Sequence, residues 1–411
     1  MARAPASLDD GRCAQEAPRA LSTMAPFHAC WVSRSRRSVP MDPQAPGPYG
    51  VDSLGSEHPG HQQKIAGIMG RVRRRWVRPR GTGRDPVGAF WRWWTDDGEE
   101  LLTAATRAGD LDAYAKVMTR RVTAMARGLE WETRPGADAE HTLYVSGGSD
   151  ASLRAVAERW FRASPPPGRR WDFAPARSAK PEMLEATITY RGRTFDLTRT
   201  RVHAAVRRAG DGFIVSVFNP GFTGRWDDEY GLCVLLLEWL LGEDDVHRWV
   251  RRTDCIVHDV VDSIPALELP ARVAEFAAGQ RPSDWLLLEG TFGNGRPVRV
   301  RVRRPLRWIE NPRSDLHTAL TVPFDADDRG LPCATAENTL RRLEDALVEE
   351  LGARGMLVAA ETSGGVRTLH VYSDSEDPKA RAVLHGAARR TRGARVRHTL
   401  DPIWKKVQDF A

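Results

Sequence analysis

The sequence predicts an α+β protein with mostly antiparallel sheets, in which two folded domains follow a disordered N-terminal tail. The chain has 411 residues, of which 41% are hydrophobic and 28% are charged, and this is enough for two hydrophobic cores. Apolar residues recur at helical spacing in some segments and alternate in others, and short turns join several of the alternating segments. Residues 1–85 show neither pattern.

The tail, predicted to span residues 1–85, is basic and rich in Pro, Gly, Ser and Arg. Such a segment cannot bury enough apolar surface to offset the entropy of ordering it. Six arginines between Arg71 and Arg80 surround Trp76, which suits either a solvated linker or a nucleic-acid-binding segment. We favour the linker because the run has no folded context.

The first domain is predicted to cover residues 86–276. Tyr114 and Met118 lie on one face of a helix with Asp110 as its N-cap, and the apolar segment 233–241 predicts a buried helix that ends at Gly242. A further helix is expected from about Asp150, with Phe161 facing inward. Strands are expected at 129–134, 142–146, 171–174, 184–190, 193–197, 213–218 and 253–261.

A linker is predicted at residues 277–283, and the second domain at 284–411. That domain opens with a hairpin, 285–288 and 298–302, which turns near Gly293. A strand around Leu320, a helix after Thr335, two strands, a helix at Pro378 and a last strand follow. The order β-α-β-β-α-β predicts a ferredoxin-like module. Residues 111–174 show a similar order, which suggests either an internal duplication or a chance agreement.

The composition excludes some classes of protein. Five scattered cysteines without a Cys-x-x-Cys pair argue against a disulfide framework and a structural zinc site, so we expect a cytoplasmic protein. No apolar run reaches the ~20 residues of a membrane span, and we expect no membrane association. The net charge of +7 favours polyanionic partners without choosing among RNA, lipid and acidic protein.

No catalytic signature is present in the sequence. It lacks a Gly-x-Ser-x-Gly elbow, a His-Glu-x-x-His motif and a phosphate-binding loop. Asp254 and His258 share one face of a predicted strand while Cys255 and Asp259 share the other, so these residues do not converge. We therefore predict no catalytic residue, no metal site and no cofactor.

Two groups of residues are candidates for partner binding. Arg299, Arg301 and Arg303 alternate with valines, so a strand would present a row of guanidinium groups on its outer face. One interpretation is that the row recognises phosphates or an acidic protein surface. The other is that it protects an edge strand from pairing with another sheet. Trp91, Trp93 and Trp94 suit a partner platform, with Trp91 and Trp94 as its candidate contact residues. Tryptophans clustered at the start of a domain are usually core residues, however, and we expect at least two of the three to be buried.

Several segments of the chain carry the features of a known family. In the C-terminal stretch they are residues 330–332, the helix 340–351, residues 367–372 and Asp401 with Trp404, and in the first domain they are residues 90–94 and residues 241–243. The C-terminal stretch resembles the bacterial domain-of-unknown-function 695 family, whose module is similar to regulator of ribonuclease activity B, an inhibitor of ribonuclease E. The first domain resembles the region that accompanies this module in some bacterial proteins. The resemblance implies a non-enzymatic binding or regulatory module.

The leading functional hypothesis is therefore a binding or regulatory protein that acts through contacts with another protein. A direct RNA-binding protein that uses the arginine row is the second hypothesis, and an unrecognised hydrolase is the third. Steep salt dependence of binding would indicate RNA, whereas a single recoverable partner would indicate protein.

Overall fold

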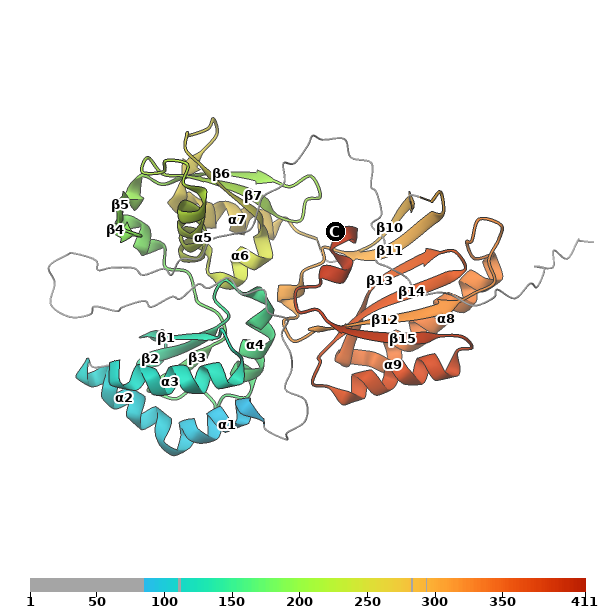
Figure 1. Ribbon diagram of the computed structural model, residues 1–411, viewed down its shortest axis with the longest axis horizontal. Coiled ribbons are helices and arrows are strands. Elements are labelled where there is room, and N and C mark those ends of the chain that lie inside the picture. Colours follow the sequence, from blue (N-terminus) through green and yellow to red (C-terminus); the bar gives the residue numbers. More distant parts are fainter. Residues whose placement is uncertain (1–84, 110–111, 282–283, 293) are drawn as a thin grey trace, which may run out of the picture.

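The computed structural model describes residues 85–109, 112–281, 284–292 and 294–411, and it confirms an α+β protein with mostly antiparallel sheets (Figure 1). Described strands form four sheets, ordered β1-β2-β3, β4-β5, β8-β7-β6-β9 and β10-β11-β13-β14-β12-β15. The basic run between Arg71 and Arg80, and the predicted cap Asp110, lie outside the described residues. No helix among the described residues is long and apolar enough to cross a membrane.

The first unit packs helices against a three-stranded sheet. Its elements are α1 (Pro86–Trp93), the π-helical turn η1 (Trp94–Gly98), α2 (Glu99–Ala108), α3 (Asp112–Met125), β1 (Glu130–Pro135), β2 (His141–Ser146), η2 (Ala151–Leu153), α4 (Arg154–Arg162) and β3 (Trp171–Ala174). Tyr114 and Met118 are buried on the predicted face of α3. Phe161, predicted to face inward, is 36% exposed because Arg154 and Glu158 occupy the buried face of α4 as an ion pair.

Aromatic rings dominate the core of this unit. The rings of Trp91 and Trp160 stack with centroids 5.0 Å apart, and the Trp91 indole N–H donates to the Trp160 carbonyl at 2.8 Å. Trp91 and Trp94 are only 7% and 1% exposed. Both tryptophans are therefore core residues, and neither forms an exposed platform for a partner.

The second unit holds a separate core around α5 and two small sheets. Its elements are η3 (Pro181–Glu185), β4 (Thr187–Tyr190), β5 (Arg193–Asp196), η4 (Leu197–Arg199), β6 (Arg201–Val206), β7 (Phe213–Phe218), α5 (Trp226–Leu241), α6 (Glu243–Trp249), β8 (Val250–Ile256), β9 (Ile264–Pro265), η5 (Ala266–Glu268) and α7 (Leu269–Ala278). Residues 86–276 thus contain two hydrophobic cores, and α7 extends into the predicted linker. The division into two domains stays a prediction.

The C-terminal unit is built on one six-stranded antiparallel sheet. Its elements are β10 (Asp284–Thr291), β11 (Pro297–Arg304), η6 (Trp308–Glu310), β12 (Leu316–Pro323), α8 (Ala334–Leu351), η7 (Gly352–Arg354), β13 (Gly355–Ser363), β14 (Val366–Ser373), α9 (Pro378–Arg390), β15 (Arg395–Leu400) and η8 (Lys405–Phe410). The carboxylate of Asp377 caps α9, as expected from Asp-Pro. Gly364 and Gly365 both have positive φ and form the turn between β13 and β14.

The two faces of this sheet are covered differently. α8 and α9 bury Leu320, Leu357 and Leu369 on one face, and these leucines belong to the strands β12, β13 and β14. On the other face, valines of β11 pack with Trp404 and Val407 at the C-terminus. In Figure 1 both long helices lie on one side of the sheet, while β10 and β11 extend beyond α8.

The sheets of the first and last units have different strand orders. In the first unit β2 pairs directly with β3, and the two strands are parallel. In the last unit the corresponding strands, β14 and β15, are separated by β12 and pair with it in antiparallel fashion. The expectation that residues 111–174 and 335–400 share one antiparallel sheet order is therefore wrong, and the different strand orders speak against an internal duplication.

A chain that begins at Asp85 is expected to unfold at the same temperature as the full chain. Asp85 itself supplies the N-cap of α1, accepting a hydrogen bond from the Gly88 N–H at 2.8 Å, so the first described helix keeps its own start signal. Circular dichroism melts of the two chains provide the measurement. A fall of many degrees in the shorter chain would mean that residues 1–84 contribute to the cores.

Candidate functional site

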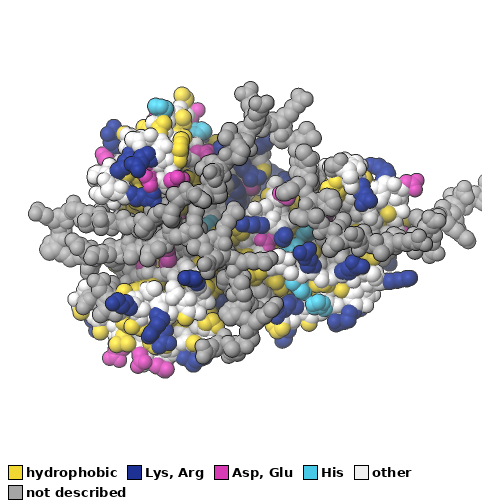
Figure 2. All heavy atoms as spheres, in the orientation of Figure 1, with side chains coloured by type: hydrophobic (Ala, Val, Ile, Leu, Met, Phe, Trp, Pro, Cys, Tyr) yellow, Lys and Arg dark blue, Asp and Glu magenta, His cyan; other side chains and the backbone are white. Residues whose placement is uncertain are grey.

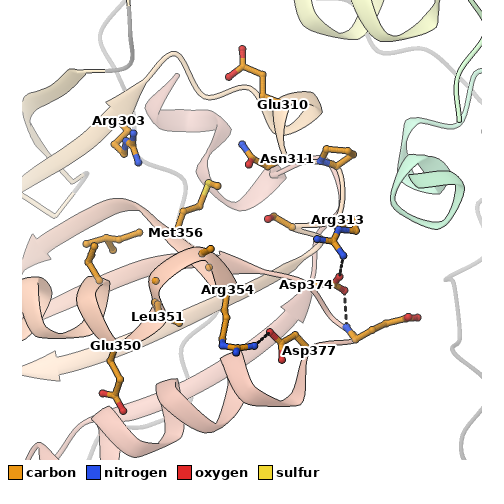
Figure 3. A pocket seen from close by; sticks show the side chains of 18 of the residues that line it. Arg303, Glu310, Asn311, Arg313, Glu350, Leu351, Arg354, Met356, Asp374 and Asp377 are labelled. Atoms are coloured by element: carbon orange, nitrogen blue, oxygen red, sulfur yellow. Dashed lines mark hydrogen bonds and ion pairs between the residues drawn. The ribbon is translucent and has the colours of Figure 1, made fainter. Parts of the chain in front are cut away.

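A groove lies on the α8 side of the C-terminal sheet, beside the β10–β11 hairpin. It has a volume of about 1690 Å³ and is lined by the hairpin, the C-terminal half of α8, residues 310–314, residues 374–377 and one end of α4. The groove forms because α8 and α9 cover β12, β13 and β14 and leave the hairpin open on this face. Figure 3 shows Arg303 and Met356 on one side of the groove, with Arg354 and Asp377 on the other.

The arginine row lies on this face of β11. The alternating valines are buried, as predicted, at 4%, 1% and 0% exposure. β11 is not an edge strand, however, because it pairs with β10 on one side and with β13 on the other. The interpretation of the row as protection of an edge strand is therefore wrong.

The three arginines have different surroundings. Arg299 is paired with Glu289 of β10 at 2.8 Å on the exposed surface. Arg301 is paired with Glu344 of α8 and lies over the Trp285 ring at 4.6 Å. Arg303 is exposed, lines the groove, and has no ion-pair partner among the described residues. Of the predicted row, only Arg303 offers an uncompensated charge.

Arg301 has a structural role, because it compensates the charge of the buried Glu344 carboxylate. This carboxylate is only 1% exposed, and it also accepts from Arg367 at 2.9 Å. Arg367 in turn donates to Glu337 at 2.6 Å. A buried carboxylate needs such partners, because an uncompensated charge in the interior is strongly unfavourable.

The groove as a whole does not suit a polyanion. Nine carboxylate residues and six arginines line it, so its own charge is acidic on balance. Figure 2 shows basic side chains scattered over the visible described surface rather than gathered in one patch. Nucleic-acid surfaces concentrate cationic side chains instead, because affinity depends on neutralising phosphates.

Arg159 of α4 joins the first unit to the wall of the groove. Its guanidinium lies 2.8 Å from Asp315 and 2.6 Å from Asp374, and its side chain is only 10% exposed. Asp315 also accepts from the backbone N–H of Ser375 at 2.8 Å. These contacts fix the end of α4 against the C-terminal unit. Sequence patterns do not predict these contacts, because the partners lie far apart along the chain.

A second ion cluster, which is partly buried, joins the first and second units. Arg177 is 2.9 Å from Glu243 and 3.0 Å from Glu132, and it also pairs with Glu130. Burial, with the nearby Glu243, raises the pKa of Glu238 to about 7. A perturbed pKa is frequent at active sites, but ion clusters between packed elements produce it as well. The described contacts here satisfy Arg177 and Glu243 and are those of a structural cluster.

The other chemically suggestive residues do not form a common site. Asp254 pairs with Arg252 and Asp259 pairs with Arg201, whereas Cys255 is buried in the core of the second unit. No disulfide joins the three described cysteines, Cys233, Cys255 and Cys333. Within the described ranges, no group of three or more His, Cys, Asp or Glu residues is arranged to hold a metal ion.

Two histidine pairs were not anticipated from the sequence. His385 and His398 meet on the surface of the C-terminal unit, with Nε2 atoms 3.1 Å apart. His317 and His370 are buried beneath the C-terminal segment, with Nε2 of His317 3.0 Å from Nδ1 of His370. Burial, with the neighbouring His370 and Lys406, lowers the pKa of His317 to about 3.

Comparison with known proteins adds no relative. No family model, no curated protein and no solved structure matches the chain.

Proposed function

We propose that the chain is a non-enzymatic binding or regulatory protein of the cytoplasm that acts through contacts with another protein. Its binding surface is the groove beside β10 and β11. The observation that carries this proposal is the uncompensated, exposed Arg303 next to the exposed Trp285, on the part of the sheet face that α8 and α9 leave open. A charged anchor beside an aromatic one is typical of protein interfaces.

The proposal includes the fold of the C-terminal unit. We infer that residues 316–400 form a ferredoxin-like module to which the β10–β11 hairpin is added. The strand order β13-β14-β12-β15, with α8 and α9 on one face, supports this inference. The resemblance to the domain-of-unknown-function 695 family and to regulator of ribonuclease activity B is part of the same proposal, since it implies a regulatory module.

RNA binding is the less favoured alternative. Two arginines of the row are already paired with glutamates, and carboxylates outnumber arginines along the groove. An RNA-binding surface would lose affinity steeply as salt rises, in proportion to the number of phosphates it neutralises. A single free arginine predicts a shallow dependence.

Replacing Arg303 by alanine is expected to leave the melting temperature nearly unchanged and to reduce recovery of the cellular partner. Arg303 is exposed, and none of the described residues depends on it for an ion pair, so its removal leaves no buried charge. A binding anchor of this kind typically contributes more than 1 kcal/mol when truncated. The measurement is an affinity pull-down from the native cell, with a thermal melt of the same protein.

Arg299→Ala is the matched control, because Arg299 lies on the same strand and face but is not among the residues lining the groove. Its exposed pair with Glu289 is worth about 0–1 kcal/mol. Arg301 is unsuitable, since its removal disturbs Glu344. Equal partner recovery by the Arg303 and Arg299 variants would reject the groove as the binding surface. Turnover of small substrates by the purified protein alone would reject the regulator hypothesis.

A further inference from the structure

The outer edge of β10 is the boundary of the C-terminal sheet, and among the described residues it pairs only with β11. Trp285, Leu286 and Leu287 follow one another along this strand and are 40%, 43% and 63% exposed. Edge strands of natural proteins are usually shortened, or interrupted by charged side chains, proline or a bulge. β10 has eight residues and a regular register without proline or a bulge, and no charged residue interrupts Trp285, Leu286 and Leu287 between Asp284 and Glu289.

The turn of the hairpin shows which backbone groups of β10 point outward. The N–H of Phe292 donates to the carbonyl of Arg296 at 2.9 Å, so these two residues form a hydrogen-bonded pair. Bonded and non-bonded pairs alternate along an antiparallel ladder. Trp285, Leu287 and Glu289 therefore belong to the non-bonded pairs of β10 and β11. Their N–H and C=O groups point toward the open edge.

The side chains of the same three residues share the face that carries the arginine row. Leu287 lies across from Arg301, whose charge is compensated by Glu344, so the middle of the edge is apolar. Trp285 lies across from Arg303, which has no ion-pair partner among the described residues. The edge thus combines unpaired backbone groups, an exposed leucine and one free positive charge.

We propose that β10 binds an extended segment of another protein by strand addition, with an apolar side chain of that segment against Leu287 and an acidic side chain directed toward Arg303. In this form of recognition the backbone hydrogen bonds supply affinity and alternate side chains supply specificity. The proposal rests on the proposed function, because it names the kind of segment that the same surface accepts.

The test uses the full chain and a phage-displayed library of short random peptides. Selected peptides are expected to alternate apolar and acidic residues with polar ones, as an extended strand requires. Leu287→Pro removes one outward N–H, which an edge strand tolerates, and is expected to weaken binding of these peptides at least tenfold with a small change in melting temperature. Leu288→Pro, which removes an N–H directed at β11, is the control that should lower the melting temperature.

A second arm does not depend on the folding of either variant. A selected peptide is made in two versions, each N-methylated at a different set of alternate residues. One version loses the N–H donors that face β10 and is expected not to bind, whereas the other keeps them. Hydrogen exchange of the free full chain should show fast exchange at Trp285, Leu287 and Glu289. Protection there before any peptide is added would overturn the proposal, because the chain itself or a second copy would then cover the edge.

Two further outcomes separate this inference from the proposed function. Selected peptides with helical spacing, or peptides that bind Leu287→Pro as tightly as the parent, would overturn strand addition. If Arg303→Ala loses the cellular partner while Leu287→Pro retains it, the groove is the binding surface and the strand proposal fails. If both variants retain that partner, the proposed function fails as well.

Discussion

Arg159→Ala is expected to lower the free energy of unfolding by about 3–5 kcal/mol, which is the usual cost of removing one partner from a buried ion pair. Arg159 compensates both Asp315 and Asp374, and the Asp315 side chain is only 5% exposed. Without the guanidinium, the buried Asp315 carboxylate has no ion-pair partner among the described residues, while Asp374 keeps the more exposed Arg313 at 3.7 Å. Urea unfolding followed by tryptophan fluorescence measures the change.

Arg162→Ala is the matched control on the same helix. Arg162 also lines the groove and pairs with Glu158 at 2.7 Å, but its side chain is 58% exposed. Water screens such a pair, so the variant should lose no more than about 1 kcal/mol. If the free energy of unfolding fell by the same amount in both variants, the contacts of Arg159 with the C-terminal unit would contribute little to stability.

Stability is expected to fall as the pH is lowered from about 6.5 toward 3, because the folded state excludes a proton from His317. The pKa of this buried histidine is lowered from 6.5 to about 3, so the unfolded chain binds the proton over this window and the folded chain does not. The contribution of neutral His317 to the free energy of unfolding is fully present above the pKa of the unfolded chain, and it is lost as the pH falls toward the pKa of the folded state. The slope from this group approaches about 1.4 kcal/mol per pH unit.

The measurement is urea unfolding at several pH values for the parent and for His317→Gln, whose slope should be shallower. It should not vanish, because burial also lowers the pKa values of His247 and His398. Leu320→Ala, on the same strand and fully buried, is the control: it should lower stability by about 2–5 kcal/mol without altering the slope. Parallel curves for the parent and His317→Gln would contradict the prediction.

The spacing of apolar residues is sufficient to predict a helix or strand where one stripe or face of that element is apolar. The helix after Thr335 is α8, and Leu340, Leu347 and Leu351 are buried as its spacing predicts. It was insufficient for β6, whose inward residues include Ala204, because alanine has little preference for strands. The short helix α6 was missed because its first turn is wholly acidic and carries no apolar stripe.

The candidate site could be predicted only in part. Alternation placed Arg299, Arg301 and Arg303 on one face of a strand, and the structure has them there. The availability of Arg301 for a partner depends on Glu344, which reaches it from a helix 43 residues further along the chain. Sequence spacing cannot reveal a compensating charge of that kind. The groove itself was not foreseen, because it depends on which strands the helices leave uncovered.

The position of β12 has a consequence for how the C-terminal unit is made. Its two neighbours, β14 and β15, both follow it in the chain, and β15 ends at Leu400. β12 therefore leaves the ribosome long before either partner exists, whereas the hairpins β10–β11 and β13–β14 close locally. The pairing of β12 on both sides is completed only after Leu400 has been made. Until then the apolar side chains of β12 are exposed to solvent. They avoid aggregation only if this delay is short or if a chaperone covers them.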